Sequence, residues 1–263
     1  MDYEQFKASI FKMTGIDLSA YKENQMKRRI NTLIEKHRIS GYDEFVNAIK
    51  NDKEMFDDFV NYLTINVSEF YRNTDQWDLM DKTFIPELID KFGNNLKIWS
   101  AACSTGDEPY SLVMAFSRHL PLSQIKIIAT DLDKQVIAAA KTGIYADKSI
   151  AGVPKDLKDK YFSKVGDSGS YQISNEIKSR VEFKEHNLLK DPYEKDCHFI
   201  VCRNVLIYFT EEAKEEIFMK FGQSLVDKGI FFIGSTEQIM NHKRFGFVRR
   251  NSFYYEKDDS LLQ

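Results

Sequence analysis

The sequence predicts an α/β protein in two parts: an all-helical N-terminal domain, residues 1–75, and a second domain, residues 76–263, built on a mostly parallel sheet. Residues 1 to about 75 show helical periodicity and no β-run. After Lys97, short apolar and β-branched runs alternate with helical patterns, which is typical of a parallel sheet covered by helices. The chain has 263 residues, 43% of them hydrophobic, so each part can build a core.

Helices in the first part follow from the spacing of apolar side chains. Residues 3–13 carry Phe6 and Ile10 at helical spacing. The segment 42–64 predicts one or two further helices with a break near Asn51. Turn-forming sequences, GIDLS and RISGYD, separate the helices. The helix expected over residues 21–37 has one apolar face, made of Met26, Ile30, Leu33 and Ile34.

Strands in the second part are expected where apolar runs precede helical patterns. The runs are LKIWSAA, QIKIIATD, RVEFKEHN, HFIVCRNVLIYF and GIFFIGS, and the helical patterns are PYSLVMAFSRHL, KQVIAAAKTG and EEAKEEIFMKFGQSL. A final pair of antiparallel strands is expected around RRN near the C-terminus. Residues of about 145–180 interrupt the alternation with a short helix and a hairpin around GDSGS, which predicts a small inserted β-subdomain.

Composition argues against several classes of protein. The formal net charge of −3 gives no global attraction to nucleic acid. No apolar run approaches the ~20 residues of a membrane span, so we expect no insertion in a membrane. The three cysteines show no CxxC spacing and the five histidines no HxxxH pair, so no metal site is expected. Reduced thiols and the lack of a signal-peptide pattern favour the cytoplasm.

Polar residues follow the predicted strands, which is where ligands bind in open α/β sheets. Residues 103–108 follow the first strand and Asp131 ends the second, while 187–188 and 203–204 follow later strands. An acidic residue at the end of the second strand can accept hydrogen bonds from both hydroxyls of a ribose. Asp131 is our candidate for that role. Its alternative is a helix N-cap, which Asp133 fits better.

The turn after the first strand, CSTGDEP, contains a single glycine, Gly106. Neither the GxGxxG pattern for a pyrophosphate nor the GxxxxGK[ST] phosphate loop is present. Asp107 and Glu108 would repel phosphate but suit a cationic nucleoside. S-adenosylmethionine (SAM) fits, because it has a ribose, a sulfonium and an ammonium but no phosphate. The alternative, that both acids only stabilise the start of the helix near Pro109, stays open.

Five motifs, taken in order, resemble those of the CheR family, the bacterial chemotaxis receptor methyltransferases. They are TINVSEFYRN, IWSAACSTGDEPYSLVM, ATDLDKQVIAAAKTGIY, HNLL and VCRNVLIYF, and the resemblance covers nearly the whole chain. It implies a Rossmann-like SAM-dependent methyltransferase fold with an inserted small β-subdomain and an all-α N-terminal domain. It also implies an activity: methyl-ester formation on glutamate side chains of chemoreceptors, which leaves S-adenosylhomocysteine as the product.

The resemblance further implies which residues form the site. Those implied for cofactor binding are Asn66, Ser68, Arg72, Glu108, Asp131, Asn187, Leu188, Arg203 and Asn204. Arg72 and Tyr208 are implied for catalysis, with the tyrosine near the transferring methyl. Two positions depart from the usual pattern: Asp107 stands where Glu is commoner, and Ser68 where Thr is frequent. Both changes keep the functional group.

Methyl transfer to a glutamate carboxylate needs no general base, because the carboxylate is already ionised at pH 7. The enzyme must desolvate and aim it, and alignment should supply most of the rate gain. Arg72 is the candidate for orienting the carboxylate, since a guanidinium can bind it in bidentate fashion, or for closing over the cofactor and facing its methionine carboxylate. The alternatives are that Arg72 is a surface charge and that Tyr208 is a packed aromatic.

A basic helix over residues 21–37 is the predicted partner surface. It includes Lys27, Arg28 and Arg29, which could dock an acidic helical bundle of a chemoreceptor. An ordinary solvated helix face is the alternative. Two other functions stay open: a SAM-dependent methyltransferase of another substrate, or a binding module that senses the cofactor without catalysis.

Overall fold

The computed structural model describes residues 1–262, which form two compact units. The first consists of residues 1–65 and 205–217, and the second of residues 66–204 and 218–262. No helix within residues 1–262 is both long and apolar enough to cross a membrane. The predicted all-α N-terminal part and α/β part are both present. The domain division between residues 75 and 76 stays a prediction.

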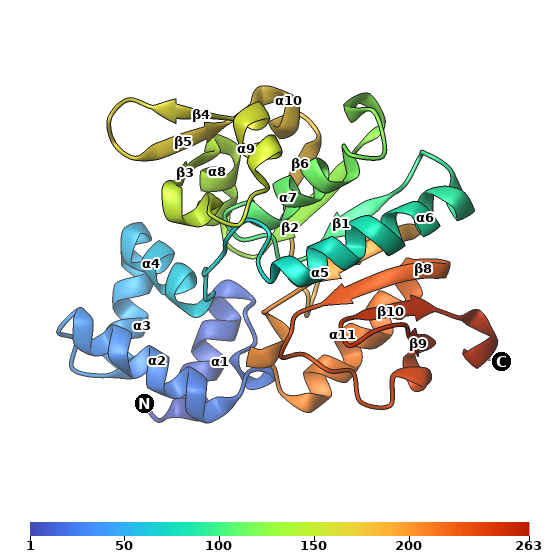
Figure 1. Ribbon diagram of the computed structural model, residues 1–263. Coiled ribbons are helices and arrows are strands. Elements are labelled where there is room, and N and C mark those ends of the chain that lie inside the picture. The colour runs from blue at the N-terminus through green and yellow to red at the C-terminus, as the bar shows by residue number, and fades with distance from the viewer. Residues whose placement is uncertain (263) are drawn as a thin grey trace. The chain divides into compact units, whose positions relative to one another are not determined.

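The first unit is built from helices, shown in blue in Figure 1. A capping box starts the first of them: the Asp2 carboxylate accepts the Gln5 N–H, and the Gln5 side chain accepts the Asp2 N–H. The predicted break near Asn51 is confirmed, because Asp52 caps a new helix by accepting the Glu54 and Met55 N–H groups. The helices are α1 (Tyr3–Thr14), α2 (Glu23–Lys36), α3 (Tyr42–Asn51) and α4 (Lys53–Leu63).

A later segment of the chain, residues 205–217, belongs to the same unit. Tyr21 and Phe209 form an antiparallel bridge, and the Lys22 N–H donates to the Tyr208 carbonyl at 2.9 Å. The Thr210 N–H donates to the Ala20 carbonyl at 2.8 Å. The residues before α2 and the short 3₁₀ turn Leu206–Tyr208 are therefore tied together by main-chain hydrogen bonds.

A seven-stranded sheet in the order β6-β2-β1-β7-β8-β10-β9 organises the second unit. The first five are parallel, and the last two add antiparallel partners, as the sequence predicted around RRN. Strand order reverses at β1, so the carboxyl ends of β1 and its neighbours border the expected ligand crevice. The strands are β1 (Ile98–Ser100), β2 (Ile127–Asp131), β6 (Val181–Glu185), β7 (Cys197–Cys202), β8 (Leu225–Ile233), β9 (Phe247–Arg249) and β10 (Tyr254–Lys257).

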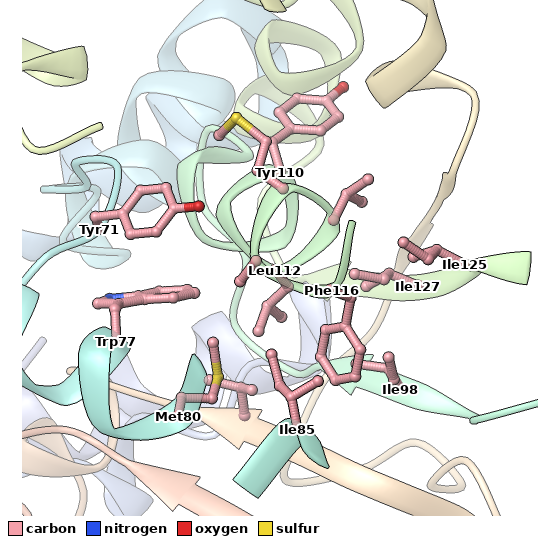
Figure 2. Packing of buried hydrophobic residues seen from close by; sticks show 14 of the residues in the cluster. Tyr71, Trp77, Met80, Ile85, Ile98, Tyr110, Leu112, Phe116, Ile125 and Ile127 are labelled. Atoms are coloured by element: carbon pink, nitrogen blue, oxygen red, sulfur yellow. The ribbon is translucent and has the colours of Figure 1, made fainter. Parts of the chain in front are cut away.

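Helices cover this sheet and supply its core. The helical patterns predicted after β1, β2 and β7 are confirmed as α7 (Asp107–Phe116), α8 (Lys134–Thr142) and α11 (Glu211–Ser224). One long helical stretch was not predicted: α5 (Thr74–Leu79) continues through a π turn (Met80–Phe84) into α6 (Ile85–Phe92). Figure 2 shows its apolar side chains packing with those of α7 over the first strands.

The inserted subdomain is a separate three-stranded antiparallel sheet in the order β3-β5-β4. The predicted hairpin around GDSGS is formed by β4 (Phe162–Val165) and β5 (Ser170–Ile173), and it is drawn in yellow in Figure 1. β3 (Ile144–Ala146) joins it from outside the predicted hairpin. The short helices α9 (Lys155–Tyr161) and α10 (Asn175–Lys178) flank the two hairpin strands in the chain.

Tyr254 on β10 offers a test of the core. Its ring stacks between Phe84 and Phe232, at centroid distances of 4.2 and 4.3 Å, and its hydroxyl donates to the Gln76 carbonyl at 2.8 Å. We expect Tyr254→Ala to lower the free energy of unfolding by about 3–5 kcal/mol. Tyr254→Phe should cost only about 1 kcal/mol, because it removes the hydrogen bond alone. Denaturant unfolding measures both values, and equal losses in the two variants would contradict this account.

Candidate cofactor-binding site

The turn that follows β1 is held against β2 by its main chain. The Cys103 N–H donates to the Thr130 carbonyl at 2.9 Å, and the Gly106 N–H donates back to the Cys103 carbonyl at 3.0 Å. Gly106 has φ +90°, in the left-handed region, and a Cβ added there would lie 2.8 Å from the Ala140 Cβ. The single glycine of the motif is thus required both by backbone conformation and by close packing.

Asp131 ends β2 and faces this turn. One of its carboxylate oxygens accepts the Ser104 N–H at 2.8 Å, and the other accepts the Asp133 N–H at 3.1 Å. Burial raises the pKa of Asp131 from 3.8 to about 6, although these hydrogen bonds act to lower it. Asp133 caps α8 by accepting the Gln135 N–H at 2.8 Å. The capping role that was the alternative for Asp131 therefore belongs to Asp133.

The two acids at the start of α7 are buried and have different partners. Asp107 accepts the Thr105 hydroxyl at 2.6 Å, and both the Thr105 and Ser68 side chains act to lower the pKa of its carboxyl. Glu108 accepts the Ser100 hydroxyl at 2.8 Å. Burial raises the pKa of both carboxyls above their ordinary values. The α7 N-terminus also favours negative charge. Stabilisation of the helix start, the alternative role, therefore explains part of the reason for acidic residues at both positions.

Three carboxylates converge on one thiol, that of Cys103. Burial raises the pKa of this thiol, and the charges of Asp131, Glu108 and Asp107 add to the rise. The turn itself, CSTGDEP, contains no lysine or arginine. The end of β1 is therefore an acidic, desolvated place that disfavours phosphate and favours a cation.

Arg203, one residue past β7, supplies the positive charge beside these acids. Its Nη1 lies 3.6 Å from the Glu108 Oε2, and its Nη2 donates to the Arg72 carbonyl and the Asn73 Oδ1, each at 2.9 Å. The guanidinium also lies over the Phe232 ring, 4.6 Å from its centroid. Burial lowers the pKa of Arg203, and Glu108 opposes that effect. These protein groups engage Nη1 and Nη2, whereas the buried Nε has no hydrogen-bond partner within residues 1–262. The predicted contact of Arg203 with the cofactor stays a prediction.

The loop of residues 66–73, named here the NVSE loop, carries three of the predicted cofactor residues. The Asn66 Nδ2 donates to the Asp133 Oδ2 at 3.0 Å, which ties the loop to the start of α8. Arg72 is half-buried, and its Nη1 donates to the Val67 carbonyl at 3.1 Å. The NVSE loop is thus tied to Asp133 through the Asn66 side chain and to Arg203 through the Arg72 carbonyl, and the contacts of Asn66, Ser68 and Arg72 with the cofactor stay a prediction.

Asn187 and Leu188 follow β6 in a clamped turn. The Asn187 N–H donates to the Asp191 carboxylate at 2.8 Å, and the Asn187 Oδ1 accepts the Leu189 N–H at 2.9 Å. The Tyr193 hydroxyl donates to the Leu188 carbonyl at 2.8 Å. The turn is therefore fixed by its own side chains, and the predicted contact of Asn187 and Leu188 with the cofactor stays a prediction.

Residues 27–29 of α2 and Tyr208 lie in the first unit. Lys27 and Arg28 are exposed, whereas Arg29 donates to the Tyr62 carbonyl and lies over the Tyr62 ring at 4.7 Å. The Arg29 guanidinium is thus used inside the unit. The role of Tyr208 beside the methyl group stays a prediction.

Comparison with family models decides the family. A model described as "CheR methyltransferase, SAM binding domain" matches residues 66–253, and one described as "CheR methyltransferase, all-alpha domain" matches residues 1–64. The chain belongs to the CheR methyltransferase family. The predicted family, the SAM-dependent methyltransferase fold and the SAM cofactor are thereby confirmed.

Relatives match the chain over nearly its whole length. It is 40% identical to the chemotaxis protein methyltransferase of Listeria monocytogenes over 256 residues, 97% of each chain. It is 36% identical to chemotaxis protein methyltransferase 1 of Pseudomonas aeruginosa over 251 residues, 91% of each chain. A solved TehB-like SAM-dependent methyltransferase from Corynebacterium glutamicum aligns at 15% identity over 70% of this chain and 94% of that one, with a TM-score of 0.38.

The residues at the ends of β1 and β2 fit SAM. The Ser104 Oγ is buried and has no hydrogen-bond partner within residues 1–262, so it can meet a ligand. Each Asp131 oxygen receives one main-chain N–H among the bonds above, which leaves lone pairs for ribose hydroxyls. The buried acids suit a sulfonium and an ammonium. Ser104 belongs to the polar turn predicted after the first strand, but neither Ser104 nor Glu237 is among the site residues that the family resemblance implied.

Gly106→Ala tests the geometry of the turn. The added methyl group would meet the Ala140 Cβ at 2.8 Å and the Tyr145 hydroxyl at 3.1 Å, at a φ that alanine disfavours. We expect a loss of about 1–3 kcal/mol in the free energy of unfolding and at least tenfold weaker SAM binding. Gly166→Ala is the matched control, since Gly166 also has positive φ but has no atom within 4 Å of an added Cβ. Equal SAM affinity in both variants would contradict the tight approach at Gly106.

Proposed function

We propose that this chain transfers a methyl group from SAM to glutamate side chains of chemoreceptors, forming glutamate methyl esters in the cytoplasm. The observation that carries this proposal is that the half-buried Arg72 lies in the NVSE loop, where its main-chain carbonyl accepts a hydrogen bond from Arg203, the cation 3.6 Å from the Glu108 carboxylate. The names of the chemotaxis methyltransferases that match the whole chain support the substrate class.

The bound cofactor supplies an electrophilic methyl group on a sulfonium, and the chain supplies orientation. A substrate carboxylate is ionised at pH 7 and needs no base. Within residues 1–262 the Arg72 guanidinium donates to the Val67 carbonyl through Nη1, and its other N–H groups can hold the two carboxylate oxygens. Arg203 holds the Arg72 main chain by donating to its carbonyl. Such fixed orientation is a large source of rate enhancement.

Cofactor binding is assigned to the residues around β1 and β2. In this proposal Asp131 accepts the ribose hydroxyls, while Glu108 lies toward the cationic part of the ligand. Asn66, Ser68, Arg72, Arg203 and Asn204 form the wall beside it. Asn187 and Leu188 form an edge for the base. Asp131, with a pKa of about 6, is mostly ionised at pH 7 and makes the site attractive to a cation.

Receptor docking is assigned to the helical domain, residues 1–75, and methyl transfer to residues 76–263. The exposed face of α2 borders an open hollow of about 400 Å³. The six residues that line it are Asn24, Lys27, Arg28, Asn31, Thr32 and Glu35. A positive surface of this kind would speed the approach of an acidic receptor helix. The main-chain bond from Lys22 to Tyr208 joins this helix to the tyrosine proposed to act near the methyl group.

The test of the proposal uses methyl-labelled SAM and membranes that bear chemoreceptors. We expect label on the receptor that mild base releases as methanol, since carboxylate methyl esters are hydrolysed by base. Asp131→Ala should remove the transfer by weakening cofactor binding. Base-stable label would indicate a methyltransferase of another kind of group. Retained SAM binding with no transfer to protein would favour a cofactor-sensing module and would refute the proposal.

The raised pKa of Asp131 predicts a pH dependence of cofactor binding. A folded-state pKa of about 6, above the ordinary 3.8, means that the carboxyl gains a proton as the pH falls through 6. The protonated form loses acceptor strength for the ribose hydroxyls, so SAM affinity should fall about tenfold between pH 7 and pH 5. Equilibrium binding across this range measures the effect. Asp131→Asn should bind weakly with a flat profile; the same slope in that variant would assign the titration elsewhere.

Charge reversal on α2 tests receptor docking. The double change Lys27→Glu and Arg28→Glu should reduce receptor methylation about tenfold at low salt, through KM for the receptor, and leave SAM affinity unchanged. Lys50→Glu, an exposed change on α3 of the same charge type, is the control and should have little effect. Arg29→Ala should instead lower the stability of the first unit, because Arg29 bonds the Tyr62 carbonyl. If the double variant methylates receptors normally, α2 is not the docking surface.

A further inference from the structure

Glu237 is a buried carboxylate in the turn that follows β8, and no step of the proposed reaction uses it. Its Oε2 accepts two main-chain hydrogen bonds, from the Asn204 N–H at 2.9 Å and from the Gly234 N–H at 2.8 Å. The Glu237 N–H donates to the Gly234 carbonyl at 3.1 Å, which closes the turn. One oxygen therefore connects the chain after β8 to the chain after β7.

Asn204 needs such support, because its backbone is in the left-handed region at φ 61°. Asparagine tolerates this region better than most residues, but it is still an uncommon conformation. The bond to Glu237 fixes the direction of the Asn204 N–H, and so the direction in which the side chain leaves the backbone. β7 and β8 are parallel neighbours, with Cys202 opposite Ile233, so the two turns leave the sheet side by side.

Gly234 allows this arrangement to be tight. A Cβ added at Gly234 would lie 2.5 Å from the Glu237 Oε2, 2.9 Å from the Asn204 nitrogen and 3.1 Å from the Asn204 Nδ2. Any other residue there would displace the carboxylate, the Asn204 backbone or its side-chain amide. The close packing thus involves the same three groups as the hydrogen bonds.

Charge gives Glu237 a second connection to the site. Burial has the largest effect on the pKa of Glu108, of the Cys202 thiol and of Arg203. Beyond burial, the Glu237 carboxylate raises the pKa of Glu108 and of Cys202, and it opposes the lowering of the Arg203 pKa. Glu237 therefore acts electrostatically on both Glu108 and Arg203. The two main-chain N–H groups stabilise its buried carboxylate.

We propose that Glu237 is a positioning residue for cofactor binding, which holds the Asn204 backbone in its left-handed conformation so that the Asn204 amide faces the cofactor. It acts through Asn204 and does not itself contact the cofactor. This inference rests on the proposed assignment of Asn204 to the cofactor site.

A double-mutant cycle on the full-length protein tests the inference, with affinity for SAM and for S-adenosylhomocysteine measured by calorimetry below the melting temperature of every variant. Glu237→Ala should weaken binding about tenfold or more, because it removes a charge-assisted acceptor and leaves two N–H groups unpaired. Glu237→Gln should restore most of the affinity, because its amide oxygen can accept the same bonds. Asn204→Ala should weaken binding, and adding Glu237→Ala to it should have little further effect.

Two further variants separate positioning from general stability. Ile230→Ala on β8 removes a fully packed side chain from the same strand and should lower the melting temperature without a matching loss of affinity. Gly234→Ala should weaken SAM binding as Glu237→Ala does, and it supplies the test if Glu237→Ala does not fold.

Several outcomes would overturn the inference. One is unchanged affinity in a folded Glu237→Ala or Gly234→Ala variant. Another is an affinity loss in Ile230→Ala as large as theirs. A third is additive losses in the Asn204 and Glu237 cycle. Unchanged affinity in Asn204→Ala would remove both the assignment of Asn204 and this inference. Receptor methyl-ester formation by the unaltered protein reports on the proposed function separately from all of these variants.

Discussion

Burial of the Arg203 guanidinium is the constraint on which the site depends. Removing an isolated charge from water is costly, so every neighbour of this side chain must contribute a compensating interaction. Glu108 supplies an opposite charge, the NVSE loop supplies the Arg72 carbonyl and the Asn73 Oδ1, and Phe232 supplies a ring face. These groups come from separate parts of the sequence. A single cation thereby fixes the loop before the sheet, the start of α7 and the end of β7.

The same cation makes an acidic site tolerable. Asp107, Glu108 and Asp131 are buried, and burial raises the pKa of each. Ionisation of such buried groups lowers the stability of the fold. Hydrogen bonds from hydroxyls and main-chain N–H groups, together with Arg203, offset a part of this loss. In the proposed function, the cationic cofactor supplies further compensation. The acids are therefore better understood as a preorganised binding surface than as a source of fold stability, which agrees with the SAM cofactor of the family.

Much of this site could be predicted from the sequence, for a physical reason. Strand ends in a parallel sheet meet at one edge, so Asp131 and the turn after β1 could be placed together from periodicity alone, and Asp133 could be recognised as the cap. The partners of Arg203 and the role of Glu237 could not, because they depend on side-chain contacts between segments far apart in the chain. The helix from Thr74 to Phe92 was missed for a different reason: its π turn breaks the regular apolar period.

The origin of these contacts also decides when the site can form. Residues that follow β1, β2, β6, β7 and β8 have to be brought to one edge, and parallel pairing of that kind joins residues far apart in sequence. The NVSE loop is held by Asp133, Arg203, Ser111 and Ser149, so its conformation depends on several separate parts of the second unit. A ligand that recognises this edge therefore binds the complete sheet and not a part of it. By linkage, its binding free energy stabilises the whole second unit, and each buried acid that it satisfies couples cofactor affinity to the integrity of the fold.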